Sequence, residues 1–249
     1  MPAQRQRRSF PVSVDSVNVN SSSDCRDTLP EDATELQRLQ AMDDFLFKEY
    51  GFRGSRNEYY TGSNSYLNEV IDDREGLPIS LSVLYMEVAA RLDLKVVGLG
   101  LPGHFVVRFE PKTDGEKPQI VDVFGRGKRL SQEEVEAIVR ARRFPQLDEF
   151  FEAQQPAAII RRMLLNLLNL AEYKRDDERI LRYLETLVAL DEENPEYRAK
   201  RLEMCARTGR LTEAIADADW FIENEPEGTA TDRLYELRAR LQEQLEDQQ

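Results

Sequence analysis

The spacing of apolar residues changes twice along the chain, and this change limits the fold more than any other feature of the sequence. Between residues 34 and 92, three segments carry apolar side chains at three- and four-residue steps, which is typical of amphipathic helices. Residues 95–124 contain three short runs rich in Val, Leu, Ile and Phe, separated by Gly and Pro, and these runs predict strands. After Ser131 the helical spacing returns and continues to the end. This order predicts an α+β domain with a small antiparallel sheet, followed by an all-helical region.

Turn and cap residues set the limits of these elements. Gly51 interrupts the first helix, and Pro78 suits the first turn of the third. Ser131 with Glu134 three residues later is typical of a capping box. The expected helices before the strands are residues 34–50, 66–73 and 78–92, and the expected strands are residues 95–101, 104–110 and 119–124.

The all-helical region contains an internal repeat with an offset of 34 residues. This period is typical of tetratricopeptide helix pairs, and the second copy carries the clearer signature, between Gly209 and Pro226. Because each helix pair buries its apolar face only against neighbours, we expect flanking helices such as residues 234–245 to cap the array. The matched positions are Leu168 with Leu202, Leu170 with Met204, Ala171 with Cys205, Ile180 with Ala214, Leu184 with Ala218, Leu187 with Phe221, and Val188 with Ile222.

The first 33 residues differ from the rest of the chain. Three arginines precede the first acid, Asp15, and apolar periodicity is almost absent. One interpretation is a disordered tail. The other is an organelle transit peptide, which would imply a plastid location, since such peptides are rich in Arg and Ser and poor in acids. We therefore predict a tail over residues 1–33, an α+β domain over residues 34–150 and a helical repeat domain over residues 151–249.

The charge balance narrows the class of partner. The 249 residues include 34 Lys and Arg against 47 Asp and Glu, a net charge of −13. Negative charge on the chain repels nucleic-acid phosphates and anionic lipids and so weakens binding to them. Neither nucleic acid nor a membrane is therefore an expected partner. No run of 18 apolar residues occurs, and the N-terminus lacks the apolar stretch of a secretory signal. The acidity is concentrated in residues 151–249, where it fits either a solvated face or a docking surface for a basic partner.

Histidine and cysteine usage excludes several kinds of site. His104 is the single histidine, so one chain cannot supply two imidazoles to a catalytic or zinc site. Cys25 and Cys205 lie far apart and form no C-x-x-C motif, which argues against a disulfide framework and against a cysteine-rich metal site. We therefore expect no metal and no cofactor, and a reducing, intracellular compartment such as the cytoplasm.

Ser80, His104 and Asp122 form the most informative combination of polar residues. A hydroxyl in the first turn of a helix lies near unsatisfied N–H groups that favour developing negative charge. A neutral imidazole can remove the hydroxyl proton, and a carboxylate can orient that imidazole. Because the three residues fall in neighbouring predicted elements, they are candidates for one catalytic site.

Four sequence runs around these residues are more specific than the spacing alone. They are residues 64–70 (NSYLNEV), 76–85 (GLPISLSVLY), 100–105 (GLPGHF) and 121–124 (VDVF). Together they resemble the SirB-type proteins, a branch of the transglutaminase-like superfamily that carries C-terminal tetratricopeptide-like helices. The likeness covers residues 42–132 and resumes at residues 162–167.

The resemblance implies a papain-like core whose active members place a Cys nucleophile at the N-terminus of a helix, with His and Asp on adjacent strands. His104 and Asp122 match the His and Asp positions, and Ser80, with Ser82 close by, matches the Cys position. Neither cysteine of the chain falls in the motif. A Ser hydroxyl is not ionised as a thiol is and needs a general base during attack. The site is therefore either rebuilt as Ser-His-Asp or converted to a binding surface.

Two functions follow from this comparison. The first is a protein-interaction or regulatory protein, a pseudoenzyme, that binds a protein partner through its C-terminal repeats. The alternative is a hydrolase or acyl transferase of protease or amidase type, with Ser80 as nucleophile, His104 as base and Asp122 as the group that orients it.

Structural roles also stay open for all three residues. Ser80 could cap its helix, His104 could be hydrogen bonded beside a glycine turn, and Asp122 could accept from turn amides near Gly125.

Overall fold

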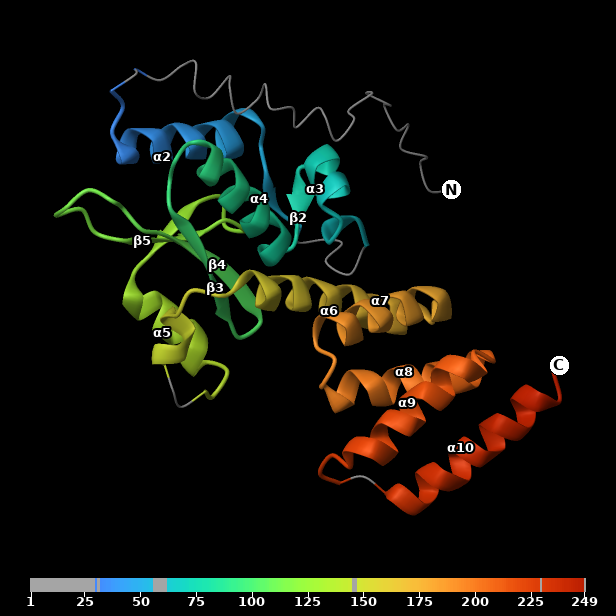
Figure 1. Ribbon diagram of the computed structural model, residues 1–249. Coiled ribbons are helices and arrows are strands. Elements are labelled where there is room, and N and C mark those ends of the chain that lie inside the picture. The colour runs from blue at the N-terminus through green and yellow to red at the C-terminus, as the bar shows by residue number, and fades with distance from the viewer. Residues whose placement is uncertain (1–29, 31, 56–61, 145–146, 229, 249) are drawn as a thin grey trace. The chain divides into compact units, whose positions relative to one another are not determined.

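Figure 1 shows the computed structural model of the chain, which describes residues 30, 32–55, 62–144, 147–228 and 230–248. Internal contacts divide the chain into two units, Met1–Gln155 and Pro156–Gln249, and each unit is described by itself. Cys25 and nearly all of the predicted tail or transit peptide lie outside the described residues.

The first helix is set by its cap. α2 (Glu35–Asp43) begins after Thr34, whose side chain accepts a hydrogen bond from the Gln37 N–H. The Gln37 side chain in turn accepts from the Thr34 N–H, which completes a capping box. The helix continues as a π-helical segment, η2 (Asp44–Glu49). The predicted helix over residues 34–50 is confirmed.

Short elements connect this helix to the main helix of the first unit. Two parallel strands of two residues each were not predicted, because so short a pairing carries no sequence period. The predicted helices over residues 66–73 and 78–92 are confirmed. The elements are β1 (Arg53–Gly54), η3 (Gly62–Asn64), α3 (Leu67–Asp73), β2 (Glu75–Gly76) and α4 (Pro78–Arg91).

The main sheet is antiparallel, with the strand order β3–β4–β5–β6. Pro102 and Gly103 form the turn between the first two strands, where Gly103 has a φ of +71° that glycine adopts readily. The three predicted strands are confirmed, although the third ends at Asp122, two residues before its predicted end, because the chain turns at Val123. The fourth, which has three residues and two basic side chains, was not predicted because it carries no strand period. The strands are β3 (Val96–Leu101), β4 (His104–Phe109), β5 (Gln119–Asp122) and β6 (Lys128–Leu130).

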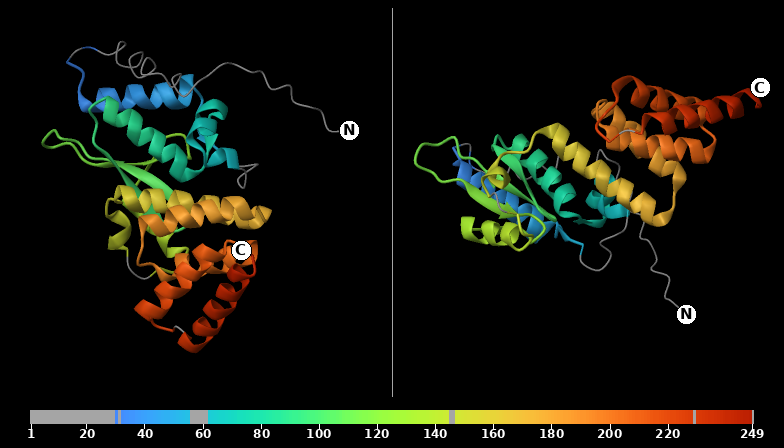
Figure 2. Two further views of the ribbon diagram at one scale, coloured as in Figure 1. Left: turned by 45° about the vertical axis from the view of Figure 1, so that its right-hand side comes forward. Right: turned by 90° about the horizontal axis from the view of Figure 1, so that it is seen from below.

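A helix packs on each face of this sheet. α4 covers one face, and α5 (Gln132–Arg140), which begins at the predicted capping box of Ser131 and Glu134, covers the other. Figure 1 and the left view of Figure 2 show α2 and α4 above the sheet and α5 below it. The apolar cluster on the α4 side includes Leu81, Tyr85, Val107, Phe109 and Val121. The cluster on the α5 side includes Leu99, Leu101, Val106, Val135 and Val139.

The second unit is formed by helices that pack against their neighbours in sequence. Most positions matched by the 34-residue repeat are buried, among them Leu168, Leu184, Cys205 and Ala218. Within the described residues, no helix is long and apolar enough to cross a membrane. The helices are α6 (Pro156–Lys174), α7 (Asp177–Leu190), α8 (Pro195–Thr208), α9 (Leu211–Asn224) and α10 (Thr231–Glu246).

A buried ion cluster joins two of these helices. Asp217 of α9 is fully buried and accepts hydrogen bonds from Arg201 of α8 at 2.8 and 2.6 Å. Arg198 of the same helix donates to it at 3.2 Å. Because a buried carboxylate without partners would be strongly destabilising, these two arginines fix how α8 packs on α9.

Candidate functional site

Ser80 lies in the first turn of α4 and is fully buried. Its Oγ atom donates to the carbonyl oxygen of Asn64 at 2.7 Å and accepts from the N–H of Leu77, the N-cap residue, at 3.0 Å. Gly76 leaves the room for this hydroxyl, because a Cβ there would lie 2.9 Å from Oγ. The hydroxyl therefore ties the start of α4 to the segment before α3.

Ser82, the neighbouring candidate for the Cys position, is also fully buried in α4. Its Oγ atom has no hydrogen-bond partner among the described residues. A buried hydroxyl without a partner lowers stability, so the two serines have opposite effects on the fold although they lie in the same helix.

His104 and Asp122 contact each other across β4 and β5. The Nε2 atom of His104 lies 3.1 Å from Oδ1 of Asp122, and both side chains are less than one fifth exposed. The N–H of Gly125 also donates to Oδ1, at 3.0 Å. Burial raises the pKa of Asp122, but the hydrogen bond and charge of His104, with the N–H groups of Gly125 and Phe124, outweigh it and leave the pKa below its usual value.

Phe124 holds the imidazole from the side. Its ring meets that of His104 edge to face, with the ring centroids 6.1 Å apart. Gly54 lies against the same phenyl ring, since a Cβ at that position would overlap it, and the Gly54 N–H donates to the Phe124 carbonyl oxygen at 3.2 Å. The short strand β1 therefore helps to position the histidine.

Phe124, which contacts the imidazole, also packs against the apolar cluster on the α4 side of the sheet. Side chains alternate along β4, so His104 shares a face with Val106, which packs against α5. α4 packs on the opposite face, against Val107. The structure thus brings His104 and Asp122 together, whereas it engages Ser80 with backbone groups of Leu77 and Asn64.

Of the two cysteines, Cys205 is the one that lies among the described residues. Cys205 is buried in α8 of the second unit, and burial raises the pKa of its thiol to about 11. A thiol with so high a pKa stays protonated near neutrality and is a poor nucleophile.

The predicted alternative role of Asp122, accepting from turn amides near Gly125, is confirmed, whereas sequence analysis missed two residues that shape the site, Asn64 and Phe124. Both missed residues lie within the sequence runs that resemble SirB-type proteins, so the signal that could have found them is that resemblance. Asn64 contacts Ser80 from 16 residues away, and Phe124 contacts His104 on β4, so neither contact could be derived from spacing.

Comparison with known proteins supports the same assignment. A family model described as "Transglutaminase-like superfamily" matches residues 20–165, more than half of the chain. The chain belongs to this superfamily. Its transglutaminase-like domain accordingly includes the main sheet, both covering helices and the His104–Asp122 pair.

Individual relatives extend the comparison. The UPF0162 protein of Xylella fastidiosa (strain Temecula1) is 39% identical over 152 residues, which cover 61% of this chain and 49% of that protein. Human F-box only protein 21 is 31% identical over 149 residues, 58% of this chain and 23% of that protein. Protein SirB1 of Salmonella typhimurium is 27% identical over 203 residues, 80% of this chain and 73% of that protein. The resemblance to SirB-type proteins is confirmed, although the chain spans about half the length of the Xylella relatives it matches.

The geometry sets what this transglutaminase-like site can do. The Asp122 carboxylate can hold the His104 imidazole in one orientation, in which the imidazole can accept a proton from a substrate or a nucleophile. Ser80 would have to give up its hydrogen bonds to Asn64 and Leu77 before its proton could pass to an imidazole. The serine-nucleophile role of residue 80 stays a prediction.

Proposed function

We propose that this chain is a protein-interaction or regulatory protein whose helical unit binds a protein partner and whose transglutaminase-like domain does not act as a thiol enzyme. The observation that carries the proposal is the state of Ser80. At the position that matches the nucleophilic Cys of active relatives, the side chain is fully buried and its hydrogen bonds go to backbone groups. A hydroxyl held in this way contributes to the stability of α4 and is shielded from a substrate.

Features of the helical unit support the binding role. Tyr173 and Tyr235 are 81% and 55% exposed, and large exposed aromatic side chains are enriched at protein interfaces. A pocket of about 500 Å³ opens between α6, α7 and α8. Both features lie in the part of the chain where the sequence predicts partner binding.

Site-specific photo-crosslinking tests this proposal in the full chain. Benzoylphenylalanine would replace Tyr173 or Tyr235 in the helical unit, or Phe144, which is 48% exposed, in the first unit as a matched control. After irradiation in native cells, we expect a discrete crosslinked protein from at least one tyrosine position and none from the control. Crosslinks from Phe144 alone would contradict binding through the helical unit.

The contact between His104 and Asp122 favours a second candidate, a serine hydrolase or acyl transferase. Here Ser80 would be the nucleophile, His104 the base and Asp122 the orienting group, as in other Ser-His-Asp enzymes. Such a role requires the Ser80 side chain to rotate away from Asn64 toward the imidazole.

A fluorophosphonate probe tests the second candidate. Labelling of the wild type that is lost in Ser80→Ala and in His104→Gln, but kept in Ser82→Ala, would establish a serine nucleophile. Labelling that persists in Ser80→Ala would exclude residue 80 from that role.

A further inference from the structure

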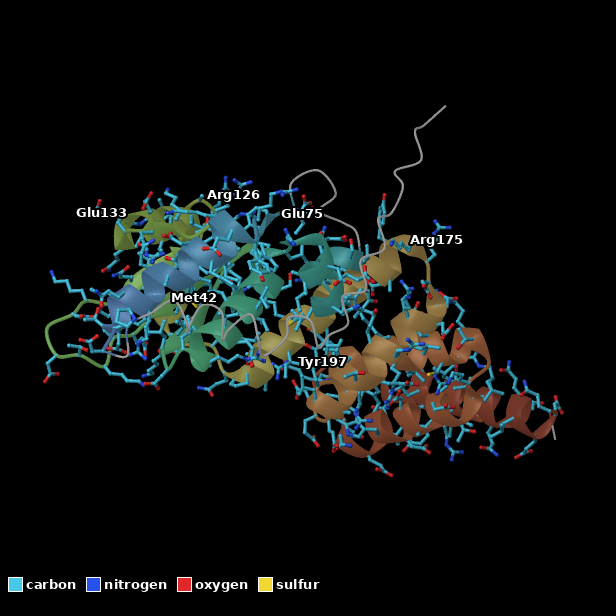
Figure 3. All side chains as sticks on the ribbon, turned by 90° about the horizontal axis from the view of Figure 1, so that it is seen from above. Met42, Glu75, Arg126, Glu133, Arg175 and Tyr197 are labelled. Carbon is cyan, nitrogen blue, oxygen red and sulfur yellow. The ribbon has the colours of Figure 1, made fainter. Side chains whose placement is uncertain are left out.

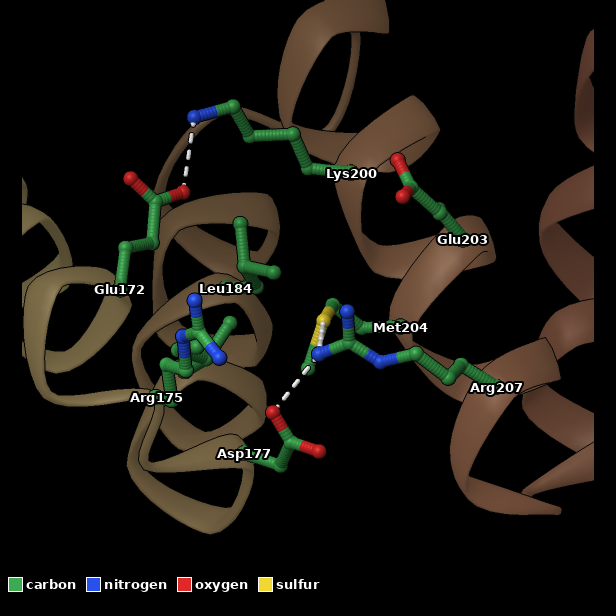
Figure 4. Close-up of a pocket in the computed structure, with 9 residues that line it drawn as sticks. Glu172, Arg175, Asp177, Leu184, Lys200, Glu203, Met204 and Arg207 are labelled. Carbon is green, nitrogen blue, oxygen red and sulfur yellow. Dashed lines mark hydrogen bonds and ion pairs between the residues drawn. The ribbon is translucent and has the colours of Figure 1, made fainter.

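The pocket of the helical unit has an apolar floor and a charged rim (Figure 4). Ile180 and Leu184 of α7 and Met204 of α8 form the floor, and each is at most 7% exposed. Its volume of about 500 Å³ lies within the range of roughly 300–1,000 Å³ that is usual for binding sites. The pocket is therefore large enough to hold a side chain and the groups next to it.

Two ion pairs neutralise most of the rim. Lys200 Nζ lies 3.0 Å from Glu172 Oε1, and Arg207 Nη2 lies 2.6 Å from Asp177 Oδ1. Figure 4 shows the two pairs bridging the pocket from α8 to the end of α6 and the start of α7. These four charges already have partners within the chain.

Arg175 and Glu203 are the remaining charges of the rim. Within the described part of the chain, neither side chain has a hydrogen bond or ion pair. They lie on opposite sides of the pocket in Figure 4, Arg175 directly after α6 and Glu203 on α8. The pocket thus presents one unpaired cation and one unpaired anion beside an apolar floor.

The backbone conformation of Arg175 also indicates that its side chain has a role. Its φ of +54° lies in the left-handed region, which glycine adopts readily and other residues disfavour. The position 34 residues later is Gly209, which ends α8 with a φ of +77°. The second copy of the repeat therefore makes this turn with glycine, whereas the first accepts the strain of a charged side chain. A strained residue whose side chain reaches a pocket points to a role for that side chain.

A second pocket shows the contrast. Arg108 and Arg129, beside β4, β5 and β6, line a pocket of about 470 Å³. Arg108 is paired with Glu110 at 2.5 Å, and Arg129 is paired with Asp43 at 2.5 Å. Both arginines of this second pocket are therefore paired within the chain, whereas Arg175 in the pocket of the helical unit has no partner among the described residues.

We propose that the pocket between α6, α7 and α8 binds a segment of a protein partner in which an apolar side chain is flanked by one acidic and one basic residue. This inference rests on the proposed function of partner binding. The acidic residue pairs with Arg175 and the basic residue with Glu203, while the apolar side chain contacts Met204, whose flexible thioether adapts to different shapes. A segment with two acids or two bases gains one of these pairs and meets a like charge at the other end.

The test follows the Met204 methyl signal in the full chain labelled with [¹³C]methyl methionine, with Met204→Leu to assign it. The probes are four acetylated and amidated tetrapeptides with two central leucines. Their end residues are glutamate and lysine in either order, two glutamates, or two lysines. We expect a saturable shift with at least one mixed-charge peptide, and a dissociation constant about fivefold lower than for either single-sign peptide.

Variants of Arg175 separate recognition from stability. Arg175→Gly removes the guanidinium and relieves the backbone, so the denaturation midpoint should stay unchanged or rise while the preference for mixed over two-lysine peptides is lost. Arg175→Glu should turn the preference toward the two-lysine peptide. Arg233→Glu makes the same charge change on α10, at an exposed residue without a partner among the described residues, and should leave the preference as in wild type.

Three results would overturn the assignment of this pocket: no saturable shift with either mixed peptide, equal affinities for all four peptides, or an unchanged preference in Arg175→Gly. If crosslinks from Tyr173 or Tyr235 accompany any of them, the helical unit binds its partner elsewhere and the proposed function stands. If no crosslink forms from the helical unit, the proposed function fails independently of the peptide result.

Discussion

The Nε2 atom of His104 lies 3.1 Å from Oδ1 of Asp122, and the same oxygen accepts the N–H of Gly125 at 3.0 Å. One carboxylate oxygen therefore anchors both the imidazole on β4 and the turn that follows β5. Because both side chains are largely buried, the protonation state of Asp122 is linked to the stability of the first unit.

Replacing Asp122 by Asn should lower the free energy of unfolding by about 1–2 kcal/mol near neutral pH. The native pKa of Asp122 lies below its unfolded value, so the stabilisation is fully present above the unfolded pKa. It is lost as the pH falls through the native pKa. The difference between wild type and Asp122→Asn should therefore shrink in acid. Urea denaturation at a series of pH values measures this, and a difference that stays constant down to acid pH would contradict it.

Ser80 and Ser82 offer a matched pair of substitutions in one buried helix turn. Ser80→Ala removes the hydroxyl that bonds Leu77 and Asn64, and should lower the free energy of unfolding by about 1–3 kcal/mol. Ser82→Ala removes a hydroxyl without a partner among the described residues, and should be neutral or stabilising.

Chemical denaturation of the two alanine variants, monitored by circular dichroism, gives both values under the same conditions. Equal losses in the two variants would show that the hydrogen bonds of Ser80 do not stabilise α4.

Much of the fold follows from sequence spacing, because its elements are long enough to show a period. The helical steps of residues 34–50 and the cap formed by Ser131 and Glu134 are both present in the structure. β1, β2 and β6 were not predicted, since their two or three residues pair with strands that only the tertiary fold brings near. Their absence from the prediction mattered, because β1 carries the glycine that supports Phe124.

The candidate site was less predictable than the fold. His104 and Asp122 could be named together because their predicted strands are consecutive and antiparallel. The direction of the Ser80 hydroxyl depends on the carbonyl oxygen of Asn64, 16 residues away, which local spacing does not reveal. A serine at position 80 is compatible with both a capping role and a nucleophilic role, so the tertiary structure is needed to choose between them.

Gly54→Ala should displace the Phe124 ring and thereby alter the environment of the His104 imidazole. The added Cβ would overlap the Phe124 ring, and overpacking of this kind lowers the free energy of unfolding by about 1–3 kcal/mol. Since Phe124 contacts the imidazole edge to face, the NMR signals of His104, the single histidine, should shift as well. Adding Phe124→Leu to the same chain makes room for the methyl group and should recover part of the lost stability. If the double variant is less stable than Gly54→Ala alone, the overlap is not the cause.

Asp217 and Asp219, two residues apart on α9, should respond differently to the same substitution. Asp217 is fully buried between Arg198 and Arg201, so Asp217→Asn leaves two arginines without their carboxylate and should lower the free energy of unfolding by about 3–5 kcal/mol. Asp219 pairs with Arg238, and both side chains are about two fifths exposed. Asp219→Asn should therefore change the free energy of unfolding by less than about 1 kcal/mol. Urea denaturation followed through the helical signal compares the two variants. Similar losses in the two variants would mean that the buried cluster does not hold α8 against α9.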